Sequence, residues 1–217
     1  MIPIVCIVGA SDSGKTTFLE KLIPELSQRG YRIGTVKHDA HGFEMDREGK
    51  DTWKHRKAGA QTIAISSPVQ IASIRTVEAE MDLGEIAGRY FWQEDLLITE
   101  GYKRSHYPKI EVFRKVVEAA PICGASDNLI AMVTDDAVDV EVPVFRFSQV
   151  SGVADFIEER FLKNRRKRRI LVNLDGRRLP LKDFVEDFVA GGIVGMLSTL
   201  RGWKSPKKID IFIRQED

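Results

Sequence analysis

The first thirty residues contain the feature that most constrains the fold. Residues 2–8 form a short apolar segment rich in β-branched side chains, and Gly9 to Thr16 then match the pattern G-x-x-x-x-G-K-[ST]. The apolar segment is typical of a fully buried parallel strand. From Thr16 to Gln28 apolar residues recur at helical spacing, and Gly30 follows as a helix stop. A strand, this loop and a helix in that order predict a phosphate-binding loop.

The residue types of this loop explain how it would hold phosphate. Glycine and small residues let the backbone N–H groups of residues 10–16 turn inward without steric strain. The helix that begins near Lys15 adds the positive end of its dipole. Lys15 would neutralise the β- and γ-phosphates, and the Thr16 hydroxyl is placed to ligate Mg²⁺. We therefore expect a nucleoside triphosphate to bind with Mg²⁺. The residues expected to bind it are Gly9, Ser11, Asp12, Ser13, Gly14, Lys15, Thr16, Thr17, Lys37 and Gly101.

A carboxylate at the end of a neighbouring strand is needed to hold Mg²⁺ or its water. Residues 95–100 predict a strand that ends at Glu100, and Gly101 would let the chain turn close to the phosphates. Glu100 is therefore the expected metal-binding and catalytic acid.

Another strand end supplies the opposite rim. Residues 31–36 predict a strand, and Lys37, His38 and Asp39 follow it directly. Ligands of parallel α/β sheets bind at the carboxyl ends of strands. We expect Lys37 to neutralise phosphate charge, and Asp39 to coordinate Mg²⁺ or to position a water as a catalytic residue. His38 and His41 are spaced for a metal, but a structural or polar role is the commoner one for loop histidines.

Strands and helices alternate along the rest of the chain. This order predicts an α/β fold, a three-layer P-loop NTPase-like domain with a mostly parallel sheet. The expected strands are residues 2–8, 31–36, 62–66, 70–76, 95–100, 109–114, 130–134 and 144–147; the expected helices are 16–28, 52–60, 82–92 and 153–162, with a loop at 37–51.

The C-terminal part breaks this pattern. The nucleotide-binding domain is expected at 1–162, a basic linker at 163–169, where six of seven residues are basic, and a small α+β extension at 170–217. Strands are expected at 170–174 and 209–213, with a turn at Asp175-Gly176 and a helix over 181–190. From Lys163 onward the net charge is +7 and before it −6. The basic tail would meet an acidic protein, a polyanionic cofactor or nucleic acid, or form a solvated face.

Composition narrows the class of protein. The 217 residues are 43% hydrophobic and 30% charged, which suits a globular chain that needs no disulfide or metal to fold. Cys6 and Cys123 lack metal-ligand spacing and favour a reduced, cytoplasmic setting. No apolar run is long enough for a bilayer and no signal peptide is expected, so we expect no membrane association.

Several motifs together resemble the molybdopterin-guanine dinucleotide biosynthesis adaptor family, MobB. The loop at 9–17 is one of them, and Leu97-Ile-Thr-Glu-Gly-Tyr-Lys103 resembles the segment where the family shows a V-E-G-[FY]-K pattern. The resemblance covers residues 1–162. Its other parts are residues 35–43, Asp46, residues 49–53 and residues 56–60.

The resemblance implies more than the residues alone do. It implies GTP as the nucleotide, weak intrinsic hydrolysis and a homodimer. It also implies an accessory role beside the guanylyltransferase that joins GMP to molybdopterin, which makes nucleic acid an unlikely partner. It places Glu100 near the metal, and the 37–51 loop beside the same site and the pterin. The chain departs from many GTP-binding relatives because Thr134-Asp135-Asp136 stands where an Asn-Lys-x-Asp motif would read guanine.

Two other enzyme or metal-binding classes are compatible with the residues. In a small-molecule kinase, Lys37 and Arg104 would bind an acceptor and Asp39 would act as base. In a metallochaperone GTPase, the four histidines would be ligands. If hydrolysis needs an arginine, Arg56, Arg104 or one from a second protomer would supply it. The four histidines are His38, His41, His55 and His106.

Overall fold

The computed structural model describes residues 2–39, 42–163, 170, 172–174, 177–211 and 213. The chain divides into two compact units, Met1–Arg165 and Arg166–Asp217. The division falls in the predicted basic linker, of which residues 164–169 lie outside the described part. Each unit is treated separately below.

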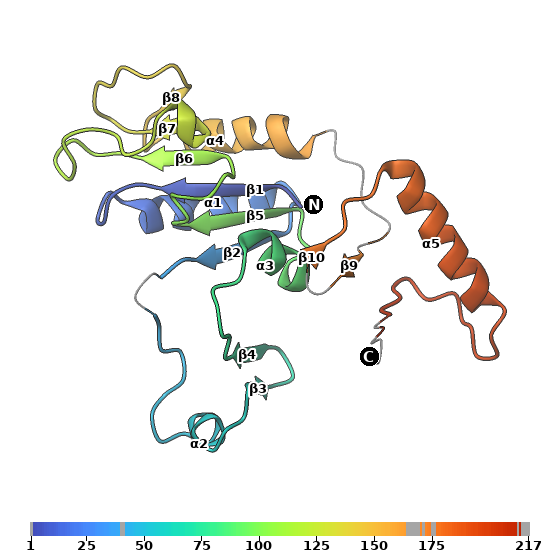
Figure 1. The fold of residues 1–217 in the computed structure, drawn as a ribbon. Coiled ribbons are helices and arrows are strands. Elements are labelled where there is room, and N and C mark those ends of the chain that lie inside the picture. Colours follow the sequence, from blue (N-terminus) through green and yellow to red (C-terminus); the bar gives the residue numbers. More distant parts are fainter. Residues whose placement is uncertain are drawn as a thin grey trace. The chain divides into compact units, whose positions relative to one another are not determined.

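The first unit is built on a six-stranded sheet in the order β2-β5-β1-β6-β7-β8 (Figure 1). Every neighbouring pair in this sheet is parallel, as the alternation of strands and helices predicts. Chain neighbours β1 and β2 are separated by β5, so the strand ending at Glu100 pairs with both of them. The strands are β1 Ile4–Val8, β2 Ile33–Lys37, β5 Leu96–Glu100, β6 Lys109–Val112, β7 Leu129–Val133 and β8 Val144–Phe145.

Helices cover both faces of this sheet. Alternate residues of a strand point to opposite faces, so Val5 and Ile7 of β1 pack in one core while Cys6 packs in the other. The first core also holds the buried faces of α1 (Lys15–Gln28) and α4 (Val150–Ile157). The second holds Leu83 and Ala87 of α3 (Leu83–Tyr90). The predicted three-layer arrangement is confirmed.

Local sequence explains where α3 begins. The α3 helix is capped by Asp82, whose carboxylate accepts a hydrogen bond from Gly84 N–H at 2.7 Å. The α4 helix continues as a π-helical turn, η2 (Glu158–Leu162), and a 3₁₀ turn, η1 (Ala125–Asp127), precedes β7.

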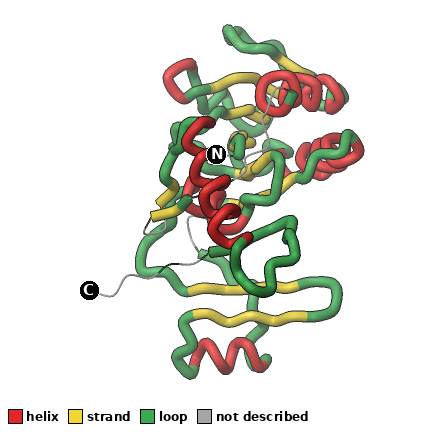
Figure 2. The backbone as a smooth tube through the Cα atoms, turned by 90° about the vertical axis from the view of Figure 1, so that its right-hand side faces the viewer, coloured by secondary structure: helices red, strands yellow, loops and turns green. Residues whose placement is uncertain are grey.

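Two predicted strands are not part of the parallel sheet. β3 (Thr62–Ser66) and β4 (Ile71–Arg75) pair only with each other, as an antiparallel hairpin beside α2 (Asp51–Lys57) (Figure 2). The four residues between them are too few for a parallel crossover, which needs a dozen or more. The sequence therefore predicted both strands correctly, but it did not predict that they form a separate two-stranded sheet.

Strand β6 carries two buried charged residues on the face of the second core. The Lys109 ammonium donates to the carbonyls of Tyr107 at 3.3 Å and Asp127 at 2.6 Å, and also to that of Ser105. The Glu111 carboxylate accepts from Ile122 N–H at 2.8 Å and Cys123 N–H at 3.0 Å. Buried charges are tolerated when hydrogen bonds satisfy them. Here those bonds hold two connections against β6, residues 101–108 before the strand and residues 113–128 after it.

The second unit contains a short hairpin and one long helix. β9 (Asn173–Leu174) pairs antiparallel with β10 (Arg177–Arg178), while the predicted turn at 175–176 lies outside the described residues. The α5 helix spans Asp183–Ser198, eight residues beyond the predicted end, because the apolar run after Gly191-Gly192 keeps it helical. No described helix in either unit is long and apolar enough to cross a membrane.

The strand predicted at 209–213 is wrong for the residues that are described. Residues 209–211 and 213 are not in a strand, and residue 212 lies outside the described part. A strand needs a partner to satisfy its backbone groups, and alternation of apolar residues alone does not supply one.

Candidate functional site

The carboxyl ends of all six parallel strands meet at one edge of the sheet. β1 leads there into the glycine-rich loop, β2 ends at Lys37 and β5 at Glu100. On the other side of β1, strand β6 leads to Arg114, β7 to Asp135 and β8 to Phe147. Residues from six distant parts of the sequence are thus brought together at the edge where parallel sheets bind ligands.

The loop at residues 9–14 needs glycine at two of its positions. Gly9 has φ +147°, and a Cβ there would lie 2.3 Å from the Val112 carbonyl oxygen. Gly14 has φ +97° and caps α1 without a side-chain hydrogen bond to the first turn. Asp12 adopts φ +61° between them. The first N–H groups of α1 therefore point into the loop, where they can bind an anion.

Two side chains of the loop have different surroundings. The Ser13 hydroxyl is buried and has no hydrogen-bond partner among the described residues. The Lys15 ammonium donates to the carbonyl oxygens of Ala10 at 2.6 Å and Gly9 at 3.1 Å. Burial lowers the pKa of Lys15, while the carboxylates of Glu100 and Asp12 act to raise it. The two carbonyl oxygens thus hold the Lys15 side chain over the loop.

A second group, which we call the β5 rim, consists of Thr16, Lys37 and Glu100. The Thr16 hydroxyl donates to the Glu100 carboxylate, with 3.1 and 3.0 Å to its two oxygens. The Lys37 ammonium lies 3.8 Å from the same carboxylate, because β2 and β5 pair in register with Lys37 opposite Glu100. The structure therefore brings these three predicted residues together.

Gly101 and His38 directly follow Glu100 and Lys37 in the sequence and pack close to each other beside the β5 rim. Gly101 has φ +99°, and a Cβ there would lie 3.1 Å from the His38 Cβ. His38 Nε2 lies 2.9 Å from a carboxylate oxygen of Glu80, and its ring lies 4.5 Å from that of Tyr102. Burial raises the pKa of the Tyr102 hydroxyl. These contacts give His38 a polar structural role and tie the segment after β4 to the rim.

The other predicted metal ligand, Asp39, follows β2 by two residues and is exposed. Within the described ranges, no group of three or more His, Cys, Asp or Glu side chains is placed to hold a metal ion. His41 lies outside those ranges. The role of Asp39, and the histidine ligands of the metallochaperone alternative, stay predictions.

A third group, the β8 rim, consists of Arg114, Asp135 and Phe147. The Arg114 guanidinium lies 4.1 Å from the centre of the Phe147 ring, and its Nε donates to the Ser13 carbonyl at 3.1 Å. The Asp135 carboxylate accepts from Phe147 N–H at 3.3 Å. The sequence did not predict Arg114 and Phe147 as site residues, although each is the last residue of a predicted strand.

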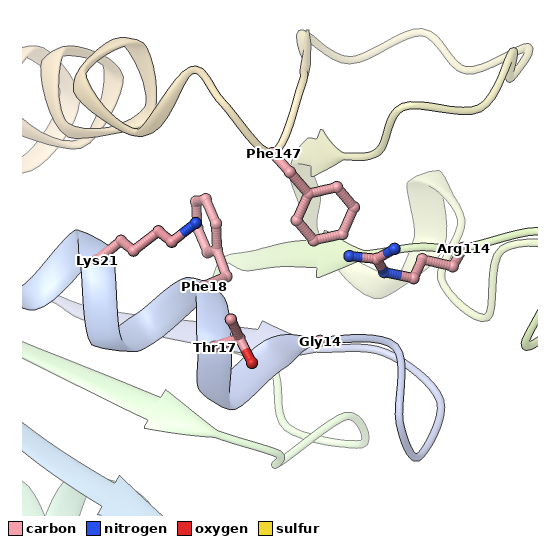
Figure 3. Close-up of a pocket in the computed structure, with 6 residues that line it drawn as sticks. All are labelled: Gly14, Thr17, Phe18, Lys21, Arg114 and Phe147. Atoms are coloured by element: carbon pink, nitrogen blue, oxygen red, sulfur yellow. The ribbon is translucent and has the colours of Figure 1, made fainter.

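Beside this rim lies a pocket of about 110 Å³. Figure 3 shows Phe147 and Arg114 on one side of it and the first turns of α1 on the other. The pocket is lined by Gly14, Thr17, Phe18, Lys21, Arg114 and Phe147.

A parallel sheet between helices, with a glycine-rich loop joining β1 to α1, defines the P-loop NTPase-like class of proteins. Residues 4–135 match the sequence profile described as "Molybdopterin guanine dinucleotide synthesis protein B". The chain belongs to this family, MobB.

Known proteins of the family resemble the chain along different lengths. The molybdopterin-guanine dinucleotide biosynthesis adapter protein of Escherichia coli is 36% identical over 163 residues, which cover 73% of this chain and 93% of that protein. A putative adapter protein of the same name from Methanocaldococcus jannaschii is 26% identical over 236 residues and covers 97% of both chains. A crystal structure of molybdopterin-guanine biosynthesis protein B superimposes with a TM-score of 0.59 at 36% identity, covering 72% of this chain and 98% of that one.

Proposed function

We propose that this protein is a GTP-binding adaptor that assists the attachment of GMP to molybdopterin, with weak GTPase activity of its own. The observation that carries the nucleotide part is the hydrogen bond between the Thr16 hydroxyl and the Glu100 carboxylate. It joins the end of the phosphate-binding loop to the end of the neighbouring strand. The adaptor part is supported by membership of the MobB family and by the similarity to adapter proteins of molybdopterin-guanine dinucleotide biosynthesis.

The residues of the β5 rim fit Mg²⁺. Thr16 and Glu100 offer a hydroxyl and a carboxylate oxygen, the hard donors that Mg²⁺ prefers. Mg²⁺ usually takes only one or two protein ligands and fills its other positions with water and phosphate. Bound Mg²⁺ would neutralise charge on the β- and γ-phosphates. Thr16 would ligate it, Glu100 would hold its water, and Asp39 would coordinate it or position a water in this proposal.

The cations of the site would hold the phosphate chain itself. Lys15 lies above the loop carbonyls and Lys37 lies beside Glu100, so a triphosphate would exchange their present oxygen partners for phosphate oxygens. Fast hydrolysis also needs the positive charge that an arginine finger places at the transferred phosphate. Lys15 and Lys37 do not replace an arginine finger, so we propose that hydrolysis is slow. Arg56, Arg104 or an arginine of a second protomer remains the candidate.

The proposal extends to the assembly and the setting of the protein. We propose that it acts as a homodimer in the cytoplasm beside the guanylyltransferase, as the family resemblance implies. We also propose that residues 170–217 form a separate extension after a basic linker. The match to the Methanocaldococcus jannaschii relative, which covers 97% of both chains, supports an extension that this relative shares.

Isothermal titration calorimetry tests the nucleotide assignment. The full chain is titrated with GTP and with ATP, each with and without Mg²⁺. We expect GTP to bind, Mg²⁺ to tighten it, and ATP to bind more weakly. Equal affinity for ATP contradicts the guanine assignment, and no heat with either nucleotide overturns the nucleotide-binding proposal as a whole.

A reconstituted reaction tests the adaptor role and the kinase alternative together. The guanylyltransferase, molybdopterin loaded with molybdenum, and Mg-GTP are incubated with and without this protein, and the dinucleotide product, any phosphorylated acceptor and released phosphate are followed. We expect more dinucleotide with the protein present. A phosphorylated acceptor in place of that increase contradicts the adaptor role and favours the kinase.

A further inference from the structure

The pocket beside the β8 rim is not explained by phosphate and metal binding. Its floor is the exposed side of the first two turns of α1, at Thr17 and Lys21, and its wall is made by Arg114 and Phe147 (Figure 3). The wall residues follow β6 and β8, more than ninety residues after the loop. Nothing in the phosphate-binding pattern requires an aromatic ring at this place.

The direction of a bound triphosphate leads toward this pocket. The terminal phosphates belong with Lys15 and Thr16, and Thr16 faces Glu100 on the β5 side of β1. The sheet order places β5 on one side of β1 and β6 to β8 on the other. A nucleotide whose γ-phosphate lies toward β5 therefore leaves the loop past Thr17, toward Arg114 and Phe147.

The wall has the chemistry that binds the face of an aromatic base. Phe147 is half-buried and its ring contacts Phe18 edge-on, with ring centres 6.4 Å apart at 85°. The Arg114 guanidinium lies 4.1 Å from the centre of the Phe147 ring while its Nε donates to the Ser13 carbonyl, so the wall and the phosphate-binding loop share one side chain. Aromatic rings and guanidinium planes are the usual partners of nucleobases outside a helix.

Two acidic residues hold this wall in place from the end of β7. The Asp135 carboxylate accepts from Phe147 N–H at 3.3 Å, and that of Asp136 accepts from Lys115 N–H at 2.7 Å. Each therefore fixes the backbone at, or next to, a wall residue. They are positioning residues in this arrangement, whether or not a remaining oxygen also contacts the base.

We propose that this pocket binds the ribose and purine base of the nucleotide, and that Phe147 and Arg114 form the wall against which the base lies. This inference deepens the proposed GTP binding and depends on it. It assigns base recognition to the face of the ring system, in a chain that lacks the Asn-Lys-x-Asp motif that would read its edge. Arg114 further links base occupancy to the shape of the phosphate-binding loop through Ser13.

The experiment compares GTP with inorganic tripolyphosphate, which has the phosphates but no base. Both are titrated with Mg²⁺ into the full chain and into Phe147→Ala. We expect the variant to bind GTP about tenfold more weakly, the usual loss when a stacking ring is removed. Tripolyphosphate affinity should stay within about twofold, because the loop is unchanged.

Phe156→Ala is the matched control. Phe156 is also half-buried, it also has an aromatic neighbour, Phe145, at 5.9 Å, and it also has an arginine, Arg160, 5.9 Å from its ring. It lies in α4 and does not line the pocket. Its removal should leave the ratio of GTP to tripolyphosphate affinity unchanged.

A second variant and an optical readout cover the case in which Phe147→Ala does not fold. Phe147→Leu keeps most of the apolar volume and removes the aromatic face. With the triphosphate of 2-aminopurine riboside, whose fluorescence is quenched on stacking, we expect quenching by the wild-type protein and clearly less by Phe147→Leu.

The outcomes separate this inference from the proposed function. Wild-type binding of GTP that Phe147→Ala and Phe147→Leu leave unchanged overturns the pocket assignment alone. An equal loss of GTP and tripolyphosphate affinity also overturns it, because the residue would then act on the loop. Failure of the wild-type protein to bind either ligand overturns the nucleotide-binding proposal itself.

Discussion

The β5 rim and the β8 rim lie on opposite sides of β1, and they differ in how they are encoded. The β5 rim joins the end of a contiguous motif, Thr16, to two neighbouring strand ends, Glu100 and Lys37. The β8 rim is built from single residues after three separate strands, without a motif of its own. The residues that would bind phosphate can therefore be predicted from the sequence. The residues that would bind the base come together only when the sheet has formed.

The largest expected effect is on the phosphate side, at Lys15. Lys15→Ala removes the cation that lies over the loop, so GTP and tripolyphosphate should both lose at least about 100-fold in affinity, the scale of two charge-assisted hydrogen bonds. Lys21→Ala, six residues along the same helix and exposed, is the control. It should leave tripolyphosphate binding unchanged. Calorimetry measures both affinities. If Lys15→Ala weakened GTP but not tripolyphosphate, the assignment of phosphate binding to one side of β1 and base binding to the other would be wrong.

The next effect separates metal from phosphate within the β5 rim. Glu100→Gln keeps the shape but removes the charge beside Thr16, so the tightening of GTP by Mg²⁺ should fall about tenfold. Binding without Mg²⁺ should change little. Asp95→Asn, at the opposite end of the same strand, is the control and should retain the full Mg²⁺ effect. Equal losses with and without Mg²⁺ would assign Glu100 to phosphate positioning instead.

A smaller effect tests how tightly the β5 rim is packed. Gly101→Ala and Gly30→Ala both place a Cβ at positive φ, which costs about 1–2 kcal/mol. A Cβ at Gly101 also meets His38 at 3.1 Å, whereas nothing lies within 4 Å of one at Gly30. Urea unfolding should show a greater loss for Gly101→Ala, and only that variant should weaken Mg-GTP. Identical behaviour of the two variants would mean that His38 can move away from the added Cβ without loss of stability or of Mg-GTP affinity.

The smallest expected effect lies in β6, between the two rims. Burial raises the pKa of Glu111 above its ordinary value of 4.5, against the opposing effect of the Ile122 and Cys123 N–H groups. The folded state therefore binds this proton more tightly than the unfolded state does. The contribution of Glu111 to stability should fall as pH rises from 4.5 through the folded pKa, and stay constant above it.

Urea unfolding of the wild-type protein and Glu111→Gln across this pH range measures the effect, because other groups cancel in the difference. The wild-type protein should gain on the variant as pH falls toward 4.5. A difference that is independent of pH would show that the two backbone N–H groups fully offset burial.

Most of the first unit could be predicted because its signals are local. The apolar segment at 2–8 and the helical spacing after Thr16 each specify one element without help from distant residues. Glu100 could be predicted as a site residue because a buried strand that ends in an acid is conspicuous in sequence.

The remaining features depend on contacts that no local pattern records. The pairing of β3 with β4 alone follows from the short connection and from which strands are available. Arg114 and Phe147 meet only because β6, β7 and β8 are neighbours in the sheet. The apolar run that prolongs α5 past Gly191-Gly192 outweighs a pair of residues that usually end helices.

Lys109 has a consequence for motion as well as for packing. Its ammonium holds carbonyls from both sides of the strand, at Ser105 and Tyr107 before it and at Asp127 after it. If either the loop before β6 or the loop after it opened alone, the buried Lys109 ammonium would lose hydrogen bonds that it needs. We therefore expect the two loops to open together. In a hydrogen-exchange experiment, the amides around these irregular segments should therefore be as slow as those of the strands, and a single lysine would act there as a cross-link without a covalent bond.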